Sequence, residues 1–234
     1  GDGAFADSRV RIIHVQNKAT DFGANCFSSS CLEKIELPDG YCGTFGMSCF
    51  DHTRIQNITW PAGDNEQTHK VVYAAFKGCK KLIDVKFQNN QKQIFIPEYC
   101  FYGCSKLKKL VFPSDTGKVI SGFTPYAENN RKAAPGTFVI RGKNTVIEST
   151  CTRKGKNLFG AEWICTPKNS KAWKIAEKSL RIRRLSEKMI RFTDQNDVWK
   201  PGDTWPKSGQ AEYSKMKRKE LVTSQKVRGF PLKR

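Results

Sequence analysis

The sequence predicts a β-rich solenoid of about four to five coils, and three observations carry this prediction. Phe27, Phe50, Phe76 and Phe101 follow one another at intervals of 23, 26 and 25 residues. An apolar triplet follows each of them at similar offsets, and a further apolar side chain lies five residues before each. The stretches between copies are polar and vary in length. Several apolar columns in phase with a period in the twenties are typical of coils that bury their apolar faces against their neighbours.

Each copy is expected to contain one short strand and one tight turn. Leu110 and Phe112 alternate with Val111, which predicts a strand that points two side chains inward. A proline then ends the strand, because proline offers no N–H to a ladder. Residues 76–79 and 101–104 each contain a glycine and predict tight turns.

Residues 96–113 resemble one particular repeat. They read Ile-Pro-Glu-Tyr-Cys-Phe-Tyr-Gly-Cys-Ser-Lys-Leu-Lys-Lys-Leu-Val-Phe-Pro, which is similar to a coil of the BspA-like leucine-rich repeat family. Residues 71–87 match nearly as well, whereas the two earlier coils have Ser29-Ser30 and His52-Thr53 in place of Gly-Cys. Residues 164–176 are similar to the segment that often closes such arrays. The resemblance implies a leucine-rich-repeat-like array and a binding or display role, without a shared active site.

Both flanks of the four copies are expected to extend the array. Residues 1–21 predict an incomplete first coil, with a capping strand within residues 9–15. After Pro113, Val119-Ile120 fits the column before the repeat phenylalanine, and residues 127–136 predict a surface loop. Two further strands are predicted at residues 137–141 and 145–148.

From Ser170 onward the period becomes helical. Ile175, Ile182 and Met189 lie seven residues apart, which predicts an amphipathic helix of about twenty residues with Asn169 or Ser170 as its N-cap. Its other face is basic, so the helix either caps the solenoid alone or also binds anions. The predicted organisation is therefore a solenoid with end caps over 1–168, a basic capping helix over 169–193 and an extended basic tail over 194–234.

Charge is concentrated in the C-terminal part. The formal net charge is +19, and residues 141–234 hold 24 Lys and Arg against 9 Asp and Glu. Isolated aromatic residues on a basic arm punctuated by Pro and Gly are typical of a segment that folds on a partner. We expect an acidic partner for this arm, either protein or RNA, beside other protein subunits; a membrane surface is the weaker alternative. The expected contact residues are Arg181, Arg183, Arg184, Trp199, Trp205, Lys217, Arg218 and Lys219.

The cysteine pattern favours reduced core thiols. The chain has nine cysteines, and Cys26, Cys49 and Cys100 share a repeat column with Ala75. A cysteine that is interchangeable with alanine behaves as a small buried hydrophobe. Disulfides or a metal remain the alternative, although no Cys-x-x-Cys pair is present. Reduced thiols favour an intracellular setting, which includes an organelle reached after removal of a targeting segment.

Little in the sequence indicates catalysis. There are three histidines and no HExxH, GxSxG or phosphate-binding Gly-Lys-Ser/Thr pattern, so we expect neither an enzyme nor a cofactor or metal. The favoured function is a non-catalytic structural subunit of a large assembly, with protein contacts on the solenoid. The alternative is a secreted or surface-displayed repeat protein for adhesion.

Overall fold

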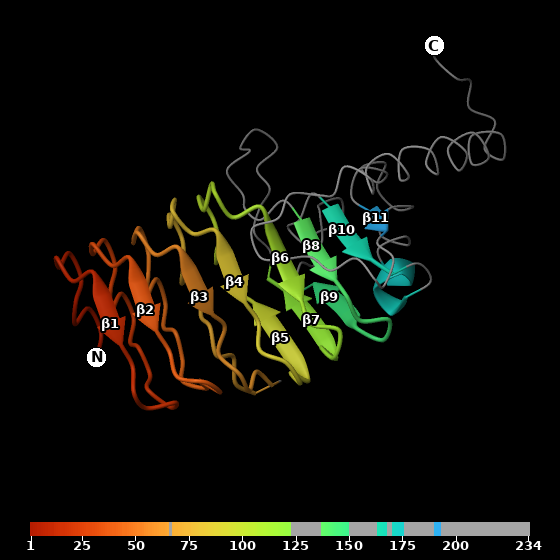
Figure 1. Cartoon of the computed structure of the whole chain (residues 1–234), viewed down its shortest axis with the longest axis horizontal. Helices are drawn as coiled ribbons and strands as arrows, with labels where there is room; N and C mark the ends of the chain where they lie inside the picture. The colour runs from red at the N-terminus through yellow and green to blue at the C-terminus, as the bar shows by residue number, and fades with distance from the viewer. Residues whose placement is uncertain (66, 123–136, 150–162, 168–169, 176–189, 193–234) are drawn as a thin grey trace, which may run out of the picture.

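The computed structural model describes residues 1–65, 67–122, 137–149, 163–167, 170–175 and 190–192. Within them the chain forms short strands that succeed one another along a single axis (Figure 1). These are β1 (Ile12–His14), β2 (Lys34–Glu36), β3 (Asn57–Thr59), β4 (Asp84–Lys86), β5 (Gln93–Ile96), β6 (Lys109–Phe112), β7 (Lys118–Ser121), β8 (Thr137–Ile140), β9 (Val146–Ser149), β10 (Trp163–Thr166) and β11 (Ile190–Phe192).

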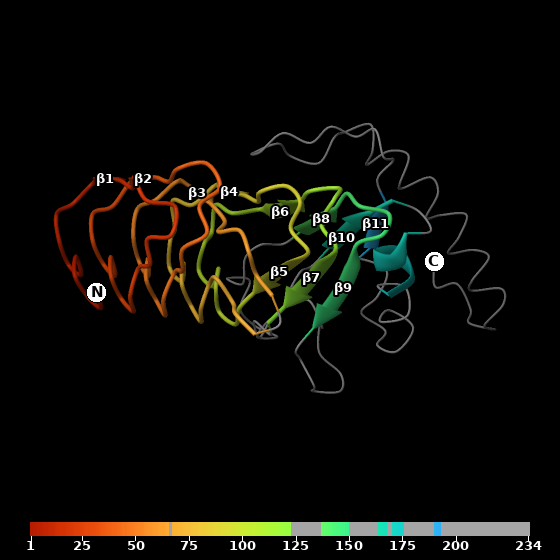
Figure 2. The same cartoon turned by 90° about the horizontal axis from the view of Figure 1, so that it is seen from below.

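Two sides of the solenoid are parallel sheets. One sheet has the order β11-β10-β8-β6-β4-β3, and the parallel pair β1-β2 continues the same row (Figure 1). The other sheet has the order β5-β7-β9 and lies on a separate side of the coil (Figure 2). In the earlier coils this second side is reduced to single bridges, from Phe22 to Phe45 and from Phe45 to Val71. We call the side formed by the six-stranded sheet and the β1-β2 pair the strand side.

The third side consists of the turns that carry the repeat phenylalanines, and we call it the turn side. Backbone hydrogen bonds connect its successive coils in one sense. The N–H of Phe5 donates to the carbonyl of Cys26 at 2.7 Å, that of Phe27 to Cys49 at 2.8 Å, and that of Phe50 to Ala75 at 2.8 Å. The buried backbone of the turns is therefore satisfied by the neighbouring coil, as a ladder satisfies a sheet.

Each turn needs two residues with left-handed backbone, four positions apart. In chain order these pairs are Gly3 and Asp7, Asn25 and Ser29, Ser48 and His52, Ala74 and Gly78, and Tyr99 and Gly103. Positive φ favours glycine, because a Cβ crowds the backbone there. The Gly of the Gly-Cys pattern is therefore a conformational requirement, which Ser29 and His52 meet at φ 58° despite their side chains.

The core is built around a column of stacked phenylalanine rings. The ring centroids of Phe5, Phe27, Phe50, Phe76 and Phe101 are successively 5.3, 5.5, 5.2 and 5.7 Å apart. The first member, Phe5, is 43% exposed but stacks on Phe27, so residues 1–21, where the sequence predicted an incomplete coil, place a phenylalanine at the end of the column. Burial of each of the other four phenylalanines contributes roughly 1.5–3 kcal/mol, so this column is a main source of stability.

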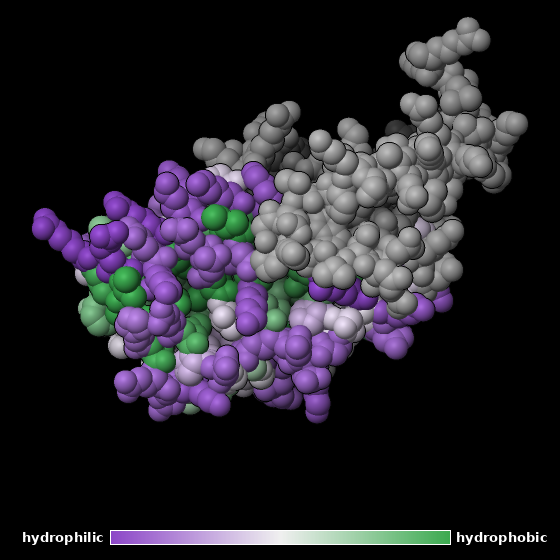
Figure 3. All heavy atoms as spheres, in the orientation of Figure 1, coloured by the Kyte–Doolittle hydropathy of each residue, from purple (hydrophilic) through white to green (hydrophobic). Residues whose placement is uncertain are grey.

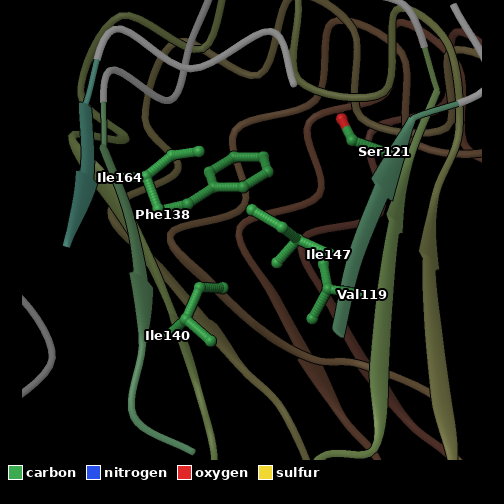
Figure 4. A pocket seen from close by; sticks show the side chains of 6 residues that line it. All are labelled: Val119, Ser121, Phe138, Ile140, Ile147 and Ile164. Atoms are coloured by element: carbon green, nitrogen blue, oxygen red, sulfur yellow. The ribbon is translucent and has the colours of Figure 1, made fainter. Parts of the chain in front are cut away.

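At the other end of the described solenoid, side chains from the two sheets meet in the interior. Val119 and Ile147 point from β7 and β9 toward Phe138, Ile140 and Ile164 of β8 and β10 (Figure 4). β8 and β9 confirm the two strands predicted after residue 136. The register of β5 and β7 pairs Ile96 with Ser121, so Ser121 holds the column position expected for Val119-Ile120. The predicted loop at 127–136 lies outside the described residues.

The C-terminal helix prediction is confirmed at its start and wrong at its end. Residues 171–175 are helical, and the Ser170 hydroxyl accepts the Trp173 N–H at 3.0 Å, as an N-cap does. Ile190–Phe192, however, form β11, which pairs in parallel with β10. A helix that begins at residue 170 therefore ends before residue 190. The pairing satisfies backbone N–H and C=O groups at the edge of β10. The two strands are distant in the sequence, so the spacing of apolar residues within residues 170–192 gives no sign of this stabilisation.

Candidate functional site

All eight C-terminal contact residues predicted from the sequence lie outside the described residues. They are Arg181, Arg183, Arg184, Trp199, Trp205, Lys217, Arg218 and Lys219. Their assignment to partner binding stays a prediction. The described surfaces for binding are the strand side, the turn side and the corner between them.

The strand side is mostly hydrophilic, with smaller hydrophobic areas between the polar side chains (Figure 3). Lys34, Glu36 and Lys86 are exposed at its outward positions. Lys34 and His14 both pair with Glu36, the histidine at 2.6 Å. These two contacts lower the pKa of Glu36, the Lys34 contact more strongly. Lys109 of β6 is only 9% exposed, so it is a poor contact residue.

The turn side carries an apolar patch that sequence reasoning missed. Met47 is 51% exposed, Val72 38% and Tyr73 43%, although all three are large hydrophobic side chains. The Ser48 N–H donates to the Tyr73 carbonyl at 3.1 Å, which places Met47 next to Val72 and Tyr73 across the coil boundary. The patch continues onto the next coil, where the rings of Tyr73 and Tyr99 are 5.5 Å apart and those of Tyr99 and Tyr102 are 5.9 Å apart. We call these five residues the turn-side patch.

This patch has the chemistry of a protein contact surface. Exposed tyrosine and methionine are enriched where proteins bind each other, since they bury a large area and lose little freedom. Scattered apolar residues on a surface are normal, but side chains that cluster over three coils are not. A signal was present in the sequence: in the column three residues before the phenylalanine, Ala24, Met47, Tyr73 and Glu98 vary, whereas the columns one and five residues before it stay apolar.

The cysteines hold the turns together and form no site of their own. Seven cysteines are free thiols: Cys31 and Cys42 are partly buried, and Cys26, Cys49, Cys79, Cys100 and Cys104 are buried. The Cys79 thiol donates to the Phe50 carbonyl at 2.9 Å, and the Cys104 thiol donates to the Phe76 carbonyl at 2.9 Å. Burial raises the pKa of the Cys104 and Cys100 thiols well above their ordinary value. Such thiols are structural rather than reactive.

The histidines have local structural contacts. The His52 ring pairs with its neighbour Asp51 at 2.6 Å, and the His69 ring stacks on Phe95 with centroids 3.8 Å apart. Among the described residues, no cluster of three or more His, Cys, Asp or Glu could hold a metal ion. No helix in this part of the chain is long and apolar enough to cross a bilayer.

Comparison with known families agrees with the coil geometry. The family model of the BspA type leucine rich repeat region matches residues 1–124 in six copies. The protein belongs to the BspA-type leucine-rich repeat family. The match begins at residue 1, consistent with a first coil around Phe5. The C-terminal extension is not covered by it. No curated protein matches the chain. Leucine-rich repeats of this kind indicate a protein-binding or adhesion role.

Proposed function

We propose that this protein is a non-catalytic structural subunit of a larger assembly, which docks a protein partner on the turn-side patch and an acidic partner on its basic C-terminal extension. The observation that carries the proposal is the patch itself. Met47, Val72 and Tyr73 expose large apolar side chains on a rigid array, and that exposure is costly in water unless a partner covers it. The acidic partner is inferred from the net positive charge of residues 141–234, which hold 24 Lys and Arg against 9 Asp and Glu.

The solenoid suits this role because its surface is held rigidly. Backbone hydrogen bonds and stacked rings fix every turn to the next coil, so the turn-side patch is pre-formed. A pre-formed surface loses little conformational entropy on binding. The exposed area of each residue is small, and affinity must therefore come from several coils together.

The test is purification of the native protein in mild detergent at low salt, with the mass of the particle measured before and after nuclease. We expect co-migration with a large particle. Nuclease sensitivity would identify RNA as the acidic partner, and resistance would identify protein. Recovery as a free monomer would overturn the proposal.

Variants separate the two docking regions. The double substitution Met47→Glu and Tyr73→Glu places charge in the turn-side patch and is expected to release the protein partner. Substitution of Lys217, Arg218 and Lys219 by Gln should instead weaken only the contact that falls with salt. The matched control, Lys18→Gln with Lys92→Gln, lowers the net charge by the same two units as the double substitution at exposed residues elsewhere and should leave both contacts intact.

The adhesion alternative predicts a different location. A surface-displayed protein meets an oxidising environment, and its cysteines would be found in disulfides or modified. Thiol titration distinguishes the two functions when the protein is purified from its natural source and then unfolded without a reductant. The subunit proposal expects nine free thiols. Recovery of the protein on the cell exterior would favour adhesion.

A further inference from the structure

The corner between the turn side and the strand side carries a row of cations. The coils around Phe5, Phe50, Phe76 and Phe101 each place basic residues just after their turn, so stacking aligns these residues along the solenoid axis. Seven residues form this row, which we call the basic ridge: Arg9, Arg11, Arg54, Lys80, Lys81, Lys106 and Lys108. All seven are exposed. Only Arg11 has an ion-pair partner within the described residues.

Backbone contacts show that these residues are neighbours in space. The Arg54 N–H donates to the Leu32 carbonyl at 2.9 Å, and the Ile83 N–H donates to the Gln56 carbonyl at 2.8 Å. Pairing of Lys86 with Val111 places Lys108 beside Ile83. Because adjacent strands lie about 4.8 Å apart, the ridge presents a positive charge at nearly every coil step.

One carboxylate already occupies this ridge. Glu33 lies between Arg11 and Arg54, on the coil between theirs. Its carboxylate accepts a hydrogen bond from the Arg11 guanidinium at 2.9 Å. That contact, with the nearby Arg54 charge, lowers the pKa of Glu33. The first coils therefore show a carboxylate held between two ridge cations that lie two coils apart.

The later coils repeat the cations without the carboxylate. The position of Glu33 is held by Gln56 in the next coil and by Ile83 in the one after. Among the described residues, Lys80, Lys81, Lys106 and Lys108 form no ion pair such as that of Arg11 with Glu33. The side chain of Ile83 is 40% exposed and offers an apolar contact beside these lysines.

We propose that the basic ridge binds an acidic segment of a partner protein, whose Asp and Glu side chains pair with the ridge cations as Glu33 pairs with Arg11 in the first coils. The spacing suits a polypeptide, because acidic side chains one helical turn apart are about 5–6 Å apart, close to the coil step. Single-stranded RNA is the poorer fit, since its binding surfaces add exposed aromatic rings for the bases. The described ridge offers Ile83 instead.

This inference rests on the protein being a binding subunit, but not on its C-terminal extension. The two basic regions are distinguished by where a ligand is attached. The probe is a short synthetic poly-glutamate peptide, joined to the full-length protein by a carbodiimide, which condenses a carboxylate and a lysine amine into an amide with loss of water. We expect attachment to Lys80, Lys81, Lys106 and Lys108. Attachment only to residues beyond 169 would overturn the inference and leave the extension as the acidic-partner site.

Charge reversal supplies the second measurement. The triple variant K80E/K81E/K106E should weaken peptide binding about tenfold or more at low salt, because three attractive contacts become repulsive. The control K18E/K86E/K92E makes the same change in net charge at exposed positions off the ridge, and should have a much smaller effect. Equal losses in both variants would show that only net charge matters and would overturn the inference. Tighter binding of poly-uridylate than of poly-glutamate at the ridge lysines would do the same in favour of RNA.

Discussion

At the scale of single residues, Gly78 and Gly40 have the same backbone but different surroundings. Their φ values are +72° and +71°, whereas a Cβ on Gly78 would approach the His52 ring at 2.7 Å and one on Gly40 would meet only the Lys18 side chain at 3.7 Å. Gly40→Ala is expected to lower the free energy of unfolding by about 1–2 kcal/mol, the cost of left-handed backbone for alanine. Gly78→Ala should cost more, as measured by urea unfolding, because His52 must also move.

A double-mutant cycle isolates the contribution of His52. In the background of His52→Gly, the cost of Gly78→Ala should fall to that of Gly40→Ala, since the ring that obstructs the new Cβ is gone. An unchanged cost would show that His52 yields freely and that only backbone strain matters at Gly78.

Asp64 gives the stability of the protein a pH dependence of definite sign. Its two carboxylate oxygens accept the N–H groups of Lys70 and Phe95 at 2.6 and 2.9 Å, yet burial raises its pKa above the ordinary 3.8. Because the folded state holds this proton more tightly than the unfolded state does, its contribution is fully present below pH 3.8 and is lost as pH rises through the folded pKa.

Substitution of Asp64 tests that sign. In urea unfolding from acidic to neutral pH, the stability of Asp64→Asn relative to the original protein should rise with pH. The variant also loses about 1–3 kcal/mol throughout, because an amide cannot accept both N–H groups. A relative stability of Asp64→Asn that falls with rising pH would contradict the assignment.

At the scale of elements, the phenylalanine column should lose more from its middle than from its end. Phe50 is fully buried and its ring stacks on those of Phe27 and Phe76, while Phe5 stacks on Phe27 alone and is 43% exposed. Phe50→Ala is expected to cost about 3–5 kcal/mol, as core cavities do, and Phe5→Ala about 1 kcal/mol. Calorimetric or urea unfolding of both variants measures this. Equal costs would mean that the first coil is as tightly packed as the centre.

The elements also show what a sequence of this kind reveals. Strands such as β6 were predictable because Leu110 and Phe112 alternate with Val111, and the repeat phase then located β2 to β4. The second sheet was not predicted, since residues 93–96 precede the repeat phenylalanine at the place where earlier coils have single bridges only. The strand β11 was interpreted as helix, because Phe192 follows Leu185 by seven residues and so continues the helical spacing, whereas pairing with the open edge of β10 cannot be seen in the local sequence.

At the scale of the whole molecule, the two surfaces that now carry functional proposals depend on coil stacking. The ridge lysines fall at different offsets in their repeats: Lys80 follows its phenylalanine by four residues and Lys106 by five. Only the three-dimensional register places them in one row. The near-neutral charge of residues 1–140 likewise conceals this local excess of cations, because acidic residues such as Asp21 and Asp39 lie in other parts of the coil.

Amide hydrogen exchange should show that the array opens from its first coil. The N–H groups of Phe5 and Phe50 make the same hydrogen bond to the next coil, at 2.7 and 2.8 Å, so bond geometry does not distinguish them. The coil of Phe5 packs on one described neighbour and that of Phe50 on two, and solenoid stability is a sum of such neighbour contacts. The Phe5 amide should therefore exchange at least about tenfold faster under native conditions, measured by NMR. Equal protection of both amides would mean that no coil opens alone, and that the stacked rings and shared backbone bonds make the described solenoid one cooperative unit.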